Sequence, residues 1–340
     1  MKGIILVFLA IGLPLLVSSD DCNAREFFEF KYKYNKVYDD AIEEHNRCQI
    51  FTKNLNEVNG SSNVGASNLV KYEEGVTKFF DLTKEEFLKR NTGLKPLTRM
   101  NPTDVRIQLP DSLLKTLPEG WEPENEELDL RVSQIPVKIQ GTCGSDWAFA
   151  PTGVFEYYLF KRFHIYYNLS EQMSVDCIRE HGCHGGMMNE VFDYFLDKGV
   201  DFASVYPYKG EEQRCQYLDT HNPKNGLDRT FARKWYVAPA DEKYLMYLLE
   251  NVGWITVAIS ADSLSSYQSG ILKGETCVGD INHAVILVGY GTDKETNTPY
   301  WILRNSWGPE WGENGYFRME RGVNACNIVD EFPNARLFLR

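Results

Sequence analysis

Hydrophobic positions along the chain change their spacing from helical in the first half to strand-like in the second. One apolar face of the segment from Asp39 to Val58 is formed by Ile42, Ile50, Phe51, Leu55 and Val58. Residues 146–162 repeat this helical spacing. After about Val252, apolar runs predict strands at 254–259, 284–290 and 300–303. Helices followed by strands predict an α+β protein with two unlike subdomains.

The first residues indicate the compartment. Met1 and Lys2 give a short positive start, the 15 residues from Gly3 to Val17 are mostly apolar, and the small residues Ser18 and Ser19 follow. This pattern predicts a signal peptide over residues 1–19, and hence a protein that is secreted or extracellular, or that resides in a gut lumen or a lysosome-like compartment. A membrane anchor is the alternative, but the run is too short and Pro14 would kink it. No later stretch reaches 18 apolar residues, so we expect no membrane partner.

Composition and charge narrow the classes of partner. The 340 residues are 43% hydrophobic and 25% charged, which is typical of a globular protein, and the net charge is −12. An acidic chain argues against nucleic-acid binding and against docking on anionic membranes. The polar stretch 93–117 contains three prolines (Pro96, Pro102 and Pro110), is followed directly by Pro118, and indicates a linker.

Cysteines and sequons fit an exported protein. The eight cysteines are Cys22, Cys48, Cys143, Cys177, Cys183, Cys215, Cys277 and Cys326. Export favours disulfides. Zinc is the competing interpretation, but no CxxC pair occurs, so we expect no metal. Asn59 and Asn168 begin N-x-S sequons and are candidate glycosylation sites.

Four separated motifs carry a resemblance to a known family. The segment Gln140–Phe149 (QGTCGSDWAF) is similar to the nucleophile segment of papain-like cysteine proteases, in which a Cys normally stands at the position of Asp146. Residues 182–186 (GCHGG) resemble the family's glycine-rich cleft wall. His283 before an apolar strand and Asn305 in the NSWG motif follow in the family's order.

The upstream residues resemble the propeptides of the same family. Glu43, Arg47 and Asn54 match a long-helix signature, and residues 75–81 match a second propeptide motif. The resemblance spans about residues 25–330. In detail the chain resembles mite group-1 allergen proteases and the inactivated scabies mite paralogues.

This resemblance implies a fold and a domain plan. The fold would be a papain-like two-subdomain α+β fold, with a helical left subdomain and a β-barrel-like right subdomain, preceded by a mainly helical propeptide. We expect a signal peptide at 1–19, an inhibitory-type propeptide and linker at 20–115, and a papain-like domain at 116–340. Within that domain, about 130–230 would be helical and about 231–330 β.

The resemblance also implies site residues. Gln140 would stabilise an oxyanion, His283 would transfer protons and Asn305 would orient His283. Gly185, Gly186 and Met188 would line the substrate-like cleft, and Trp307 would cover the contact between Asn305 and His283. The family's disulfide pairs would be Cys143–Cys183, Cys177–Cys215 and Cys277–Cys326, which leaves Cys22 and Cys48 to bridge each other.

Asp146 changes the expected chemistry. A carboxylate keeps a negative charge at a helix start and should pair with His283. Its attack on an amide would give a mixed anhydride, which is uphill, and loss of the nucleophile costs about 10⁶-fold in turnover in a well-studied serine protease. Asp146, His283, Asn305 and Gln140 would then form a degenerate site. On this reasoning the chain is no enzyme but a secreted, catalytically inactive homologue without a cofactor.

Such a homologue would act by binding protein or peptide ligands. It would be a decoy for protease inhibitors, a competitor for substrates, or a modulator of host defence through host proteins. One alternative is an active papain-like endopeptidase in which Asp146 is an artefact of the sequence. Another is a structural or storage protein. Pro151 allows either a shifted helix start or a helix released from keeping catalytic geometry.

Overall fold

The computed structural model describes residues 22–61, 72–95, 117–178, 181–216, 226–227, 235–330 and 336–339. The predicted signal peptide and most of the predicted linker lie outside these residues. None of the helices in the described ranges has both the length and the apolar character needed to cross a membrane.

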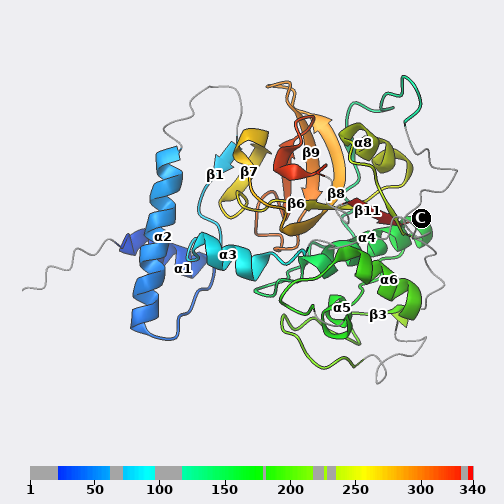
Figure 1. Cartoon of the computed structure of the whole chain (residues 1–340). Helices are drawn as coiled ribbons and strands as arrows, with labels where there is room; N and C mark the ends of the chain where they lie inside the picture. Colours follow the sequence, from blue (N-terminus) through cyan, green and yellow to red (C-terminus); the bar gives the residue numbers. More distant parts are fainter. Residues whose placement is uncertain are drawn as a thin grey trace, which may run out of the picture.

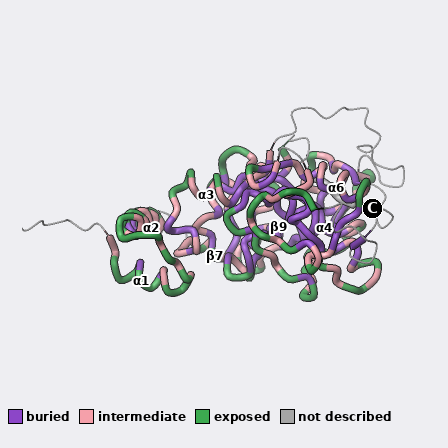
Figure 2. The backbone as a smooth tube through the Cα atoms, turned by 90° about the horizontal axis from the view of Figure 1, so that it is seen from below, coloured by how far each residue is buried: buried purple, intermediate pink, exposed green. Residues whose placement is uncertain are grey.

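The N-terminal part forms a mainly helical lobe at one side of the molecule (Figure 1). It contains α1 (Ala24–Lys33), α2 (Ala41–Ser61), β1 (Tyr72–Glu74) and α3 (Lys84–Asn91). Phe27, Phe30, Phe51 and Phe80 form its small core, and a Cys22–Cys48 disulfide joins the start of the lobe to α2. Figure 2 shows α1 and α2 protruding from one end of the molecule, with exposed outer surfaces.

Helices of the main body pack around α4 (Asp146–Phe163). They are α5 (Glu171–Cys177) and α6 (Met188–Lys198), and a short ladder joins β3 (Val200–Asp201) to β4 (Gly226–Leu227). α4 is buried along most of its length, and Pro151 lies inside it without ending it. The helix therefore neither starts late nor breaks at the proline.

A mixed sheet forms the other layer, in the order β1-β7-β10-β9-β8-β6-β11-β5, with β2 paired to β8. Its strands after β1 are β2 (Leu128–Asp129), β5 (Trp235–Val237), β6 (Ile255–Ile259), β7 (Tyr267–Leu272), β8 (His283–Thr292), β9 (Pro299–Arg304), β10 (Tyr316–Glu320) and β11 (Arg336–Leu339). α8 (Glu242–Asn251) packs on this layer, and two 3₁₀ turns lie at Gly274–Thr276 and Ala325–Asn327. β1 comes from the N-terminal lobe and pairs antiparallel with β7, so the lobe is attached through the sheet edge.

The site lies where the two layers meet. α4 packs against β8, and one core cluster joins residues from both. A second core lies between α8 and the sheet. The α+β prediction and the predicted helices and strands are confirmed to within a few residues. The domain boundaries of the sequence analysis remain predictions.

Candidate active site

Asp146 is the first residue of α4 and is fully buried. Two features hold the turn before it. The Cys143–Cys183 disulfide ties the turn to the facing wall. Gly144 packs so closely that an added Cβ would lie 2.9 Å from the carbonyl oxygen of Cys183. A carboxylate at a helix N-terminus is stabilised by the helix dipole, so the fold places a negative charge here at low cost.

His283 begins β8 and lies between two acceptors. Its Nδ1 lies 2.7 Å from Asp146 Oδ2, and its Nε2 lies 3.0 Å from Asn305 Oδ1. The backbone N–H of Ser306 donates to the same Asn305 oxygen over 2.8 Å, which fixes that atom as an acceptor. An ionised Asp146 carboxylate and the Asn305 oxygen both act as acceptors, so the hydrogen-bond pattern around His283 suits a ring that carries a proton on each nitrogen.

The two Asp146 oxygens have different surroundings. Oδ2 accepts from His283 and from the Ala284 N–H over 2.8 Å. Oδ1 is buried and has no hydrogen-bond partner. It faces Gly93 of the N-terminal lobe, where an added Cβ would lie 2.9 Å away. Departure of that segment would therefore leave a carboxylate oxygen facing the emptied cleft.

Gln140 and Trp307 complete the site from the other side. Ser306 Oγ donates to Gln140 Oε1 over 2.6 Å, which leaves the Gln140 Nε2 group to donate to other acceptors. The Trp307 ring stacks on His283, with centroids 4.8 Å apart. Trp307 thus covers the histidine that contacts Asn305.

Gly185 and Gly186 form the facing wall. Gly186 lies against the Trp147 ring, where a Cβ would come within 2.5 Å of it. Gly185 has a φ of +96°, a conformation that favours glycine. Met188 is the first residue of α6 and is fully buried while residues 93–95 occupy the cleft, so its place in the cleft lining stays a prediction.

A segment of the N-terminal lobe occupies the cleft. Gly186 N–H donates to Gly93 O over 2.9 Å, Lys95 N–H donates to Gly186 O over 2.9 Å, and Leu94 N–H donates to Asn282 O over 3.1 Å. Gln140 Nε2 and Trp307 Nε1 both donate to Asn91 O, over 3.2 and 3.1 Å. The interpretation of residues 93–117 as a linker was wrong for 93–95, because their backbone fills the cleft. No sequence spacing signalled this pairing.

Lys78 makes a second contact between the lobe and the site. Its Nζ donates to the Trp307 carbonyl oxygen over 2.5 Å. Burial lowers the pKa of Lys78 to about 8. This lysine was also missed by the motif analysis, because a single Lys in a propeptide-like segment carries no spacing signal.

No thiol is available at the site. The four disulfides are Cys22–Cys48, Cys143–Cys183, Cys177–Cys215 and Cys277–Cys326, and they account for all eight cysteines. In the described part of the chain no cluster of three or more potential metal ligands occurs. Asn59 and Asn168, the candidate glycosylation sites, are both exposed.

Comparison with known proteins places these features in a family. Residues 124–334 match the papain family cysteine protease model, and residues 27–87 match the cathepsin propeptide inhibitor domain. The chain belongs to the papain family of cysteine proteases. Its N-terminal lobe is therefore called the propeptide below.

Relatives match over nearly the whole length. The chain is 37% identical to a viral cathepsin of Orgyia pseudotsugata multicapsid polyhedrosis virus, covering 98% of this chain and 99% of the relative. A viral cathepsin of Heliothis zea nuclear polyhedrosis virus is 35% identical, covering 95% of this chain and 88% of the relative. The solved structure of digestive procathepsin L2 from Tenebrio molitor larval midgut matches with a TM-score of 0.78 and 31% identity, covering 93% of this chain and 99% of that chain.

These relatives contradict the prediction that the chain is no enzyme. They are named as cathepsins and procathepsins, and they point to a peptidase. The prediction rested on the chemistry of one residue, Asp146, whereas the similarity extends over the cleft, both layers and the propeptide.

The narrower resemblance to mite proteases remains a prediction. A structure from work on the mite allergens Blo t 1 and Der p 1 is among the matches, at 27% identity and a TM-score of 0.72, covering 92% of this chain and 98% of that chain.

Proposed function

We propose that this protein is the precursor of a papain-family endopeptidase that binds extended peptide segments across the N-terminus of α4. The observation that carries the proposal is the propeptide backbone in the cleft. Its Asn91 carbonyl accepts from Gln140 Nε2 and Trp307 Nε1, and its Gly93–Lys95 segment pairs with Gly186 and Asn282. A cleft that satisfies one peptide backbone in this way has the donors and acceptors to bind another.

The proposed chemistry uses water in place of a thiolate. A water molecule hydrogen-bonded to Asp146 Oδ1 attacks the peptide carbonyl carbon and gives its proton to that carboxylate. Gln140 Nε2 donates to the developing oxyanion. The His283 imidazolium protonates the leaving amine, and the proton on Asp146 then returns to His283.

Such a reaction should be slow. In a well-studied serine protease, binding and the oxyanion hole alone retain about 10³- to 10⁴-fold acceleration over water after the nucleophile is lost. We expect a residual rate of that order here, because Gln140, His283 and Asn305 keep their hydrogen bonds.

The biological setting follows from the same proposal. The partners are protein or peptide substrates, and protein inhibitors that enter the same cleft are a second class of partner. The predicted signal peptide would bring the protein to a secretory or lysosome-like compartment, with Asn59 and Asn168 as glycosylation sites. Removal of the propeptide between Lys95 and Leu117 would open the cleft.

The test is a hydrolysis assay before and after propeptide removal. A recognition site for a sequence-specific protease, inserted between Lys95 and Leu117, allows the propeptide to be cut off. Cleavage of a denatured protein substrate is then followed by mass spectrometry of its fragments. His283→Ala is the matched control, since it removes the proton donor and keeps Asp146 and Gln140.

We expect fragments only after the cut, insensitivity to a thiol-alkylating reagent, and loss of fragments in His283→Ala. Equal background cleavage by the wild-type protein and His283→Ala would overturn the proposal.

A further inference from the structure

A buried cluster of three charged side chains lies behind the cleft. Lys138 Nζ contacts Glu156 Oε1 and Glu171 Oε1, each over 2.6 Å, and also donates to Leu169 O over 3.1 Å. Both carboxylates are almost inaccessible, with 0% and 3% of the side chain exposed. One ammonium group thus forms ion pairs with two buried carboxylates. When all three groups are ionised, the cluster has a net charge of −1.

Glu156 has one satisfied and one unsatisfied oxygen. Oε1 accepts from Lys138 and from the Leu169 N–H over 2.8 Å. Oε2 is buried with no partner. A carboxylate that gains a proton would therefore take it on Oε2, because both donors already point at Oε1.

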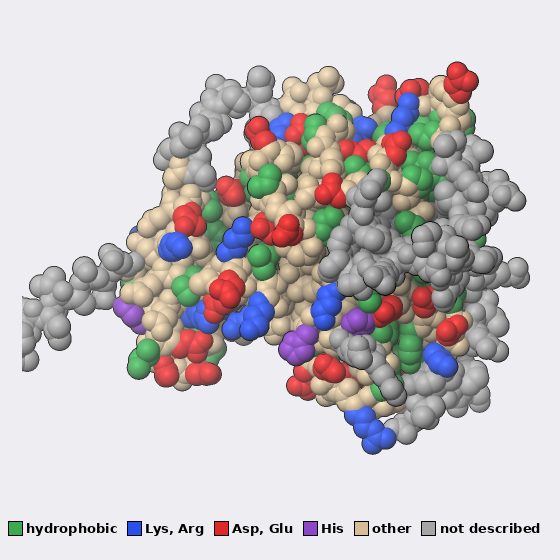
Figure 3. All heavy atoms as spheres, in the orientation of Figure 1, with side chains coloured by type: hydrophobic (Ala, Val, Ile, Leu, Met, Phe, Trp, Pro, Cys, Tyr) green, Lys and Arg blue, Asp and Glu red, His purple; other side chains and the backbone are tan. Residues whose placement is uncertain are grey.

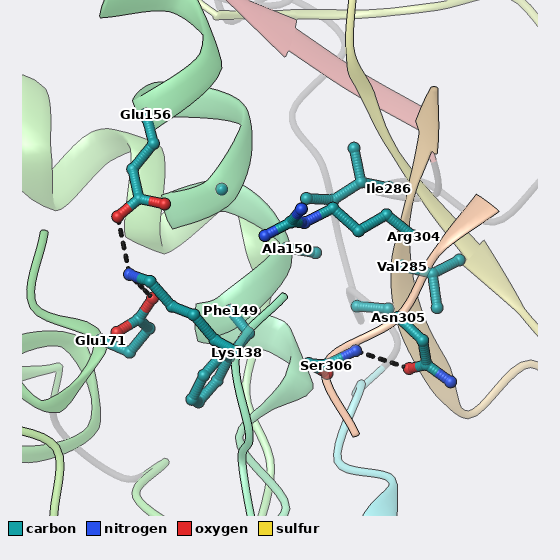
Figure 4. A pocket seen from close by; sticks show the side chains of 12 residues that line it. Lys138, Phe149, Ala150, Glu156, Glu171, Val285, Ile286, Arg304, Asn305 and Ser306 are labelled. Atoms are coloured by element: carbon teal, nitrogen blue, oxygen red, sulfur yellow. Dashed lines mark hydrogen bonds and ion pairs between the residues drawn. The ribbon is translucent and has the colours of Figure 1, made fainter. Parts of the chain in front are cut away.

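A small cavity adjoins this cluster. Figure 4 shows Glu156 and Arg304 reaching toward it from opposite sides, above Ala150. Its volume, counted as space for the centre of a water molecule, is about 20 Å³. About 10–15 Å³ suffices for one water. A water there would accept a hydrogen bond from a proton on Glu156 Oε2.

The titratable groups that face Glu156 come from several elements. They are Lys138 in the segment before α4, Tyr166 in the loop after it, Glu171 on α5 and Arg304 on β9. Arg304 donates to Ile135 O and Tyr316 Oη over 2.9 and 3.0 Å.

Burial, with the negative charge of Glu171 adding to it, raises the pKa of Glu156 to about 7, although the positive charge of Lys138 opposes the rise. Burial alone would lower the pKa of Lys138, but the two carboxylates raise it above its usual range.

The cluster is connected directly to the cleft. Lys138 lies two positions before Gln140, and its carbonyl oxygen accepts from Gly308 N–H over 3.0 Å. Gln140 N–H donates to Ser306 O over 2.8 Å. A change in the hydrogen bonds of the Lys138 ammonium therefore shifts the short segment 138–140, which determines the position of the Gln140 amide.

We propose that protonation of Glu156 changes how the cluster of Lys138, Glu156 and Glu171 positions Gln140. The proton is carried on Glu156 Oε2 and is hydrogen-bonded to one water in the cavity. This cluster is called the joint below. Lys138 is a positioning residue in this joint and touches no substrate. The inference rests on the proposed function only in regarding Gln140 as a donor of the cleft.

The test follows the Gln140 side-chain amide by NMR in the intact precursor labelled with ¹⁵N-glutamine. Its signal is assigned by its loss in Gln140→Met. We expect its chemical shift to titrate with a midpoint near pH 7 in the wild-type protein. In Glu156→Gln, which mimics the protonated acid, the titration should vanish. In the matched control Glu171→Gln, the midpoint should move to lower pH, because Lys138 then serves a single carboxylate.

The outcomes separate the joint from a merely structural ion cluster. A wild-type signal that does not titrate between pH 5 and 8, or a titration that persists in Glu156→Gln, would overturn the inference. Should Glu156→Gln fail to fold, the direction of the Glu171→Gln shift decides, since an unrelated histidine would titrate unchanged in that variant. The measurement needs no catalysis, so its result is independent of the hydrolysis assay.

Discussion

Replacement of Gly93 by alanine should loosen the propeptide from the cleft. An added Cβ would lie 2.0 Å from Gly144 O and 2.9 Å from Asp146 Oδ1, so the segment must move away from the turn that precedes α4. The φ of Gly93 lies outside the left-handed region, so alanine brings no backbone strain of its own. The whole effect is therefore a steric conflict with the cleft.

The magnitude follows from the hydrogen bonds that the movement breaks. Three backbone hydrogen bonds join Gly93, Leu94 and Lys95 to Gly186 and Asn282. At about 0.5–1.5 kcal/mol each, their loss weakens closure by about 1.5–4.5 kcal/mol. Since about 1.4 kcal/mol corresponds to a factor of ten, the opening equilibrium should rise about 10- to 1000-fold.

Hydrogen exchange measured by mass spectrometry on the intact precursor would detect this change. The amides of Leu94, Lys95 and Gly186, which donate these hydrogen bonds, should exchange faster by the same factor, while those of α2 stay protected. Gly60→Ala is the matched control, because the space around Gly60 is open and alanine favours its helix. Equal protection of the cleft amides in the two variants would refute the reasoning.

Three further predictions concern the stability of the precursor. The two hydrogen bonds from the Arg47 guanidinium lower the pKa of Glu86 from its usual 4.5 to about 2, so the stability from this pair is present above pH 4.5 and is lost as the pH falls toward 2. Propeptide amides should therefore lose protection from hydrogen exchange between pH 4.5 and 2, and Glu86→Gln should abolish this pH dependence. The same pH dependence in Glu86→Gln would contradict the prediction. Replacing Cys22 and Cys48 by serine removes a disulfide between residues 26 positions apart and should reduce the free energy of unfolding of the propeptide by about 3 kcal/mol. Its unfolding temperature should fall, and an unchanged unfolding temperature would contradict the prediction. Asp146→Ala removes the acceptor of two buried hydrogen bonds, from His283 and from the Ala284 N–H, and should reduce the free energy of unfolding by about 1–3 kcal/mol in urea titrations; an unchanged free energy of unfolding would contradict it.

The sequence was informative where chemistry depends on residue type and order. Gln140, His283 and Asn305 lie in motifs, and the structure brings them together around Asp146. The pairing of Asp146 with His283 could be anticipated, because the two residues stand at the positions of the family's nucleophile and histidine. These residues are recognisable because each type performs a task that few others can.

Other parts of the site depend on tertiary contacts that no spacing reveals. Lys138, Glu156 and Glu171 look like ordinary surface charges in the sequence, and their burial follows only from the packing of α4 against β8 and of α5 against α4. Gly93–Lys95 was interpreted as linker, because a segment that pairs through its backbone needs no particular side chains. The interior position of Pro151 was equally open, since the surrounding core, rather than local propensity, keeps α4 continuous.

Figure 3 shows acidic and basic side chains interspersed over the propeptide face. Charged residues of the propeptide also form defined pairs: Lys36 pairs with the buried Asp81 before α3, and Arg47 on α2 pairs with Glu86 on α3. The net charge of −12 therefore says little about this surface. Specific pairs, rather than overall charge, connect α2 to the part of the propeptide that enters the cleft.

Peptide hydrolysis by the wild-type protein and Asp146→Cys, compared after removal of the propeptide, tests most directly whether Asp146 stands at the nucleophile position of a working peptide cleft. The variant should be about 10⁶-fold faster in turnover than the wild-type protein and should be stopped by a thiol-alkylating reagent, whereas the wild-type rate should not respond to that reagent. Equal rates in the two proteins, or inhibition of the wild-type protein by alkylation, would contradict the account.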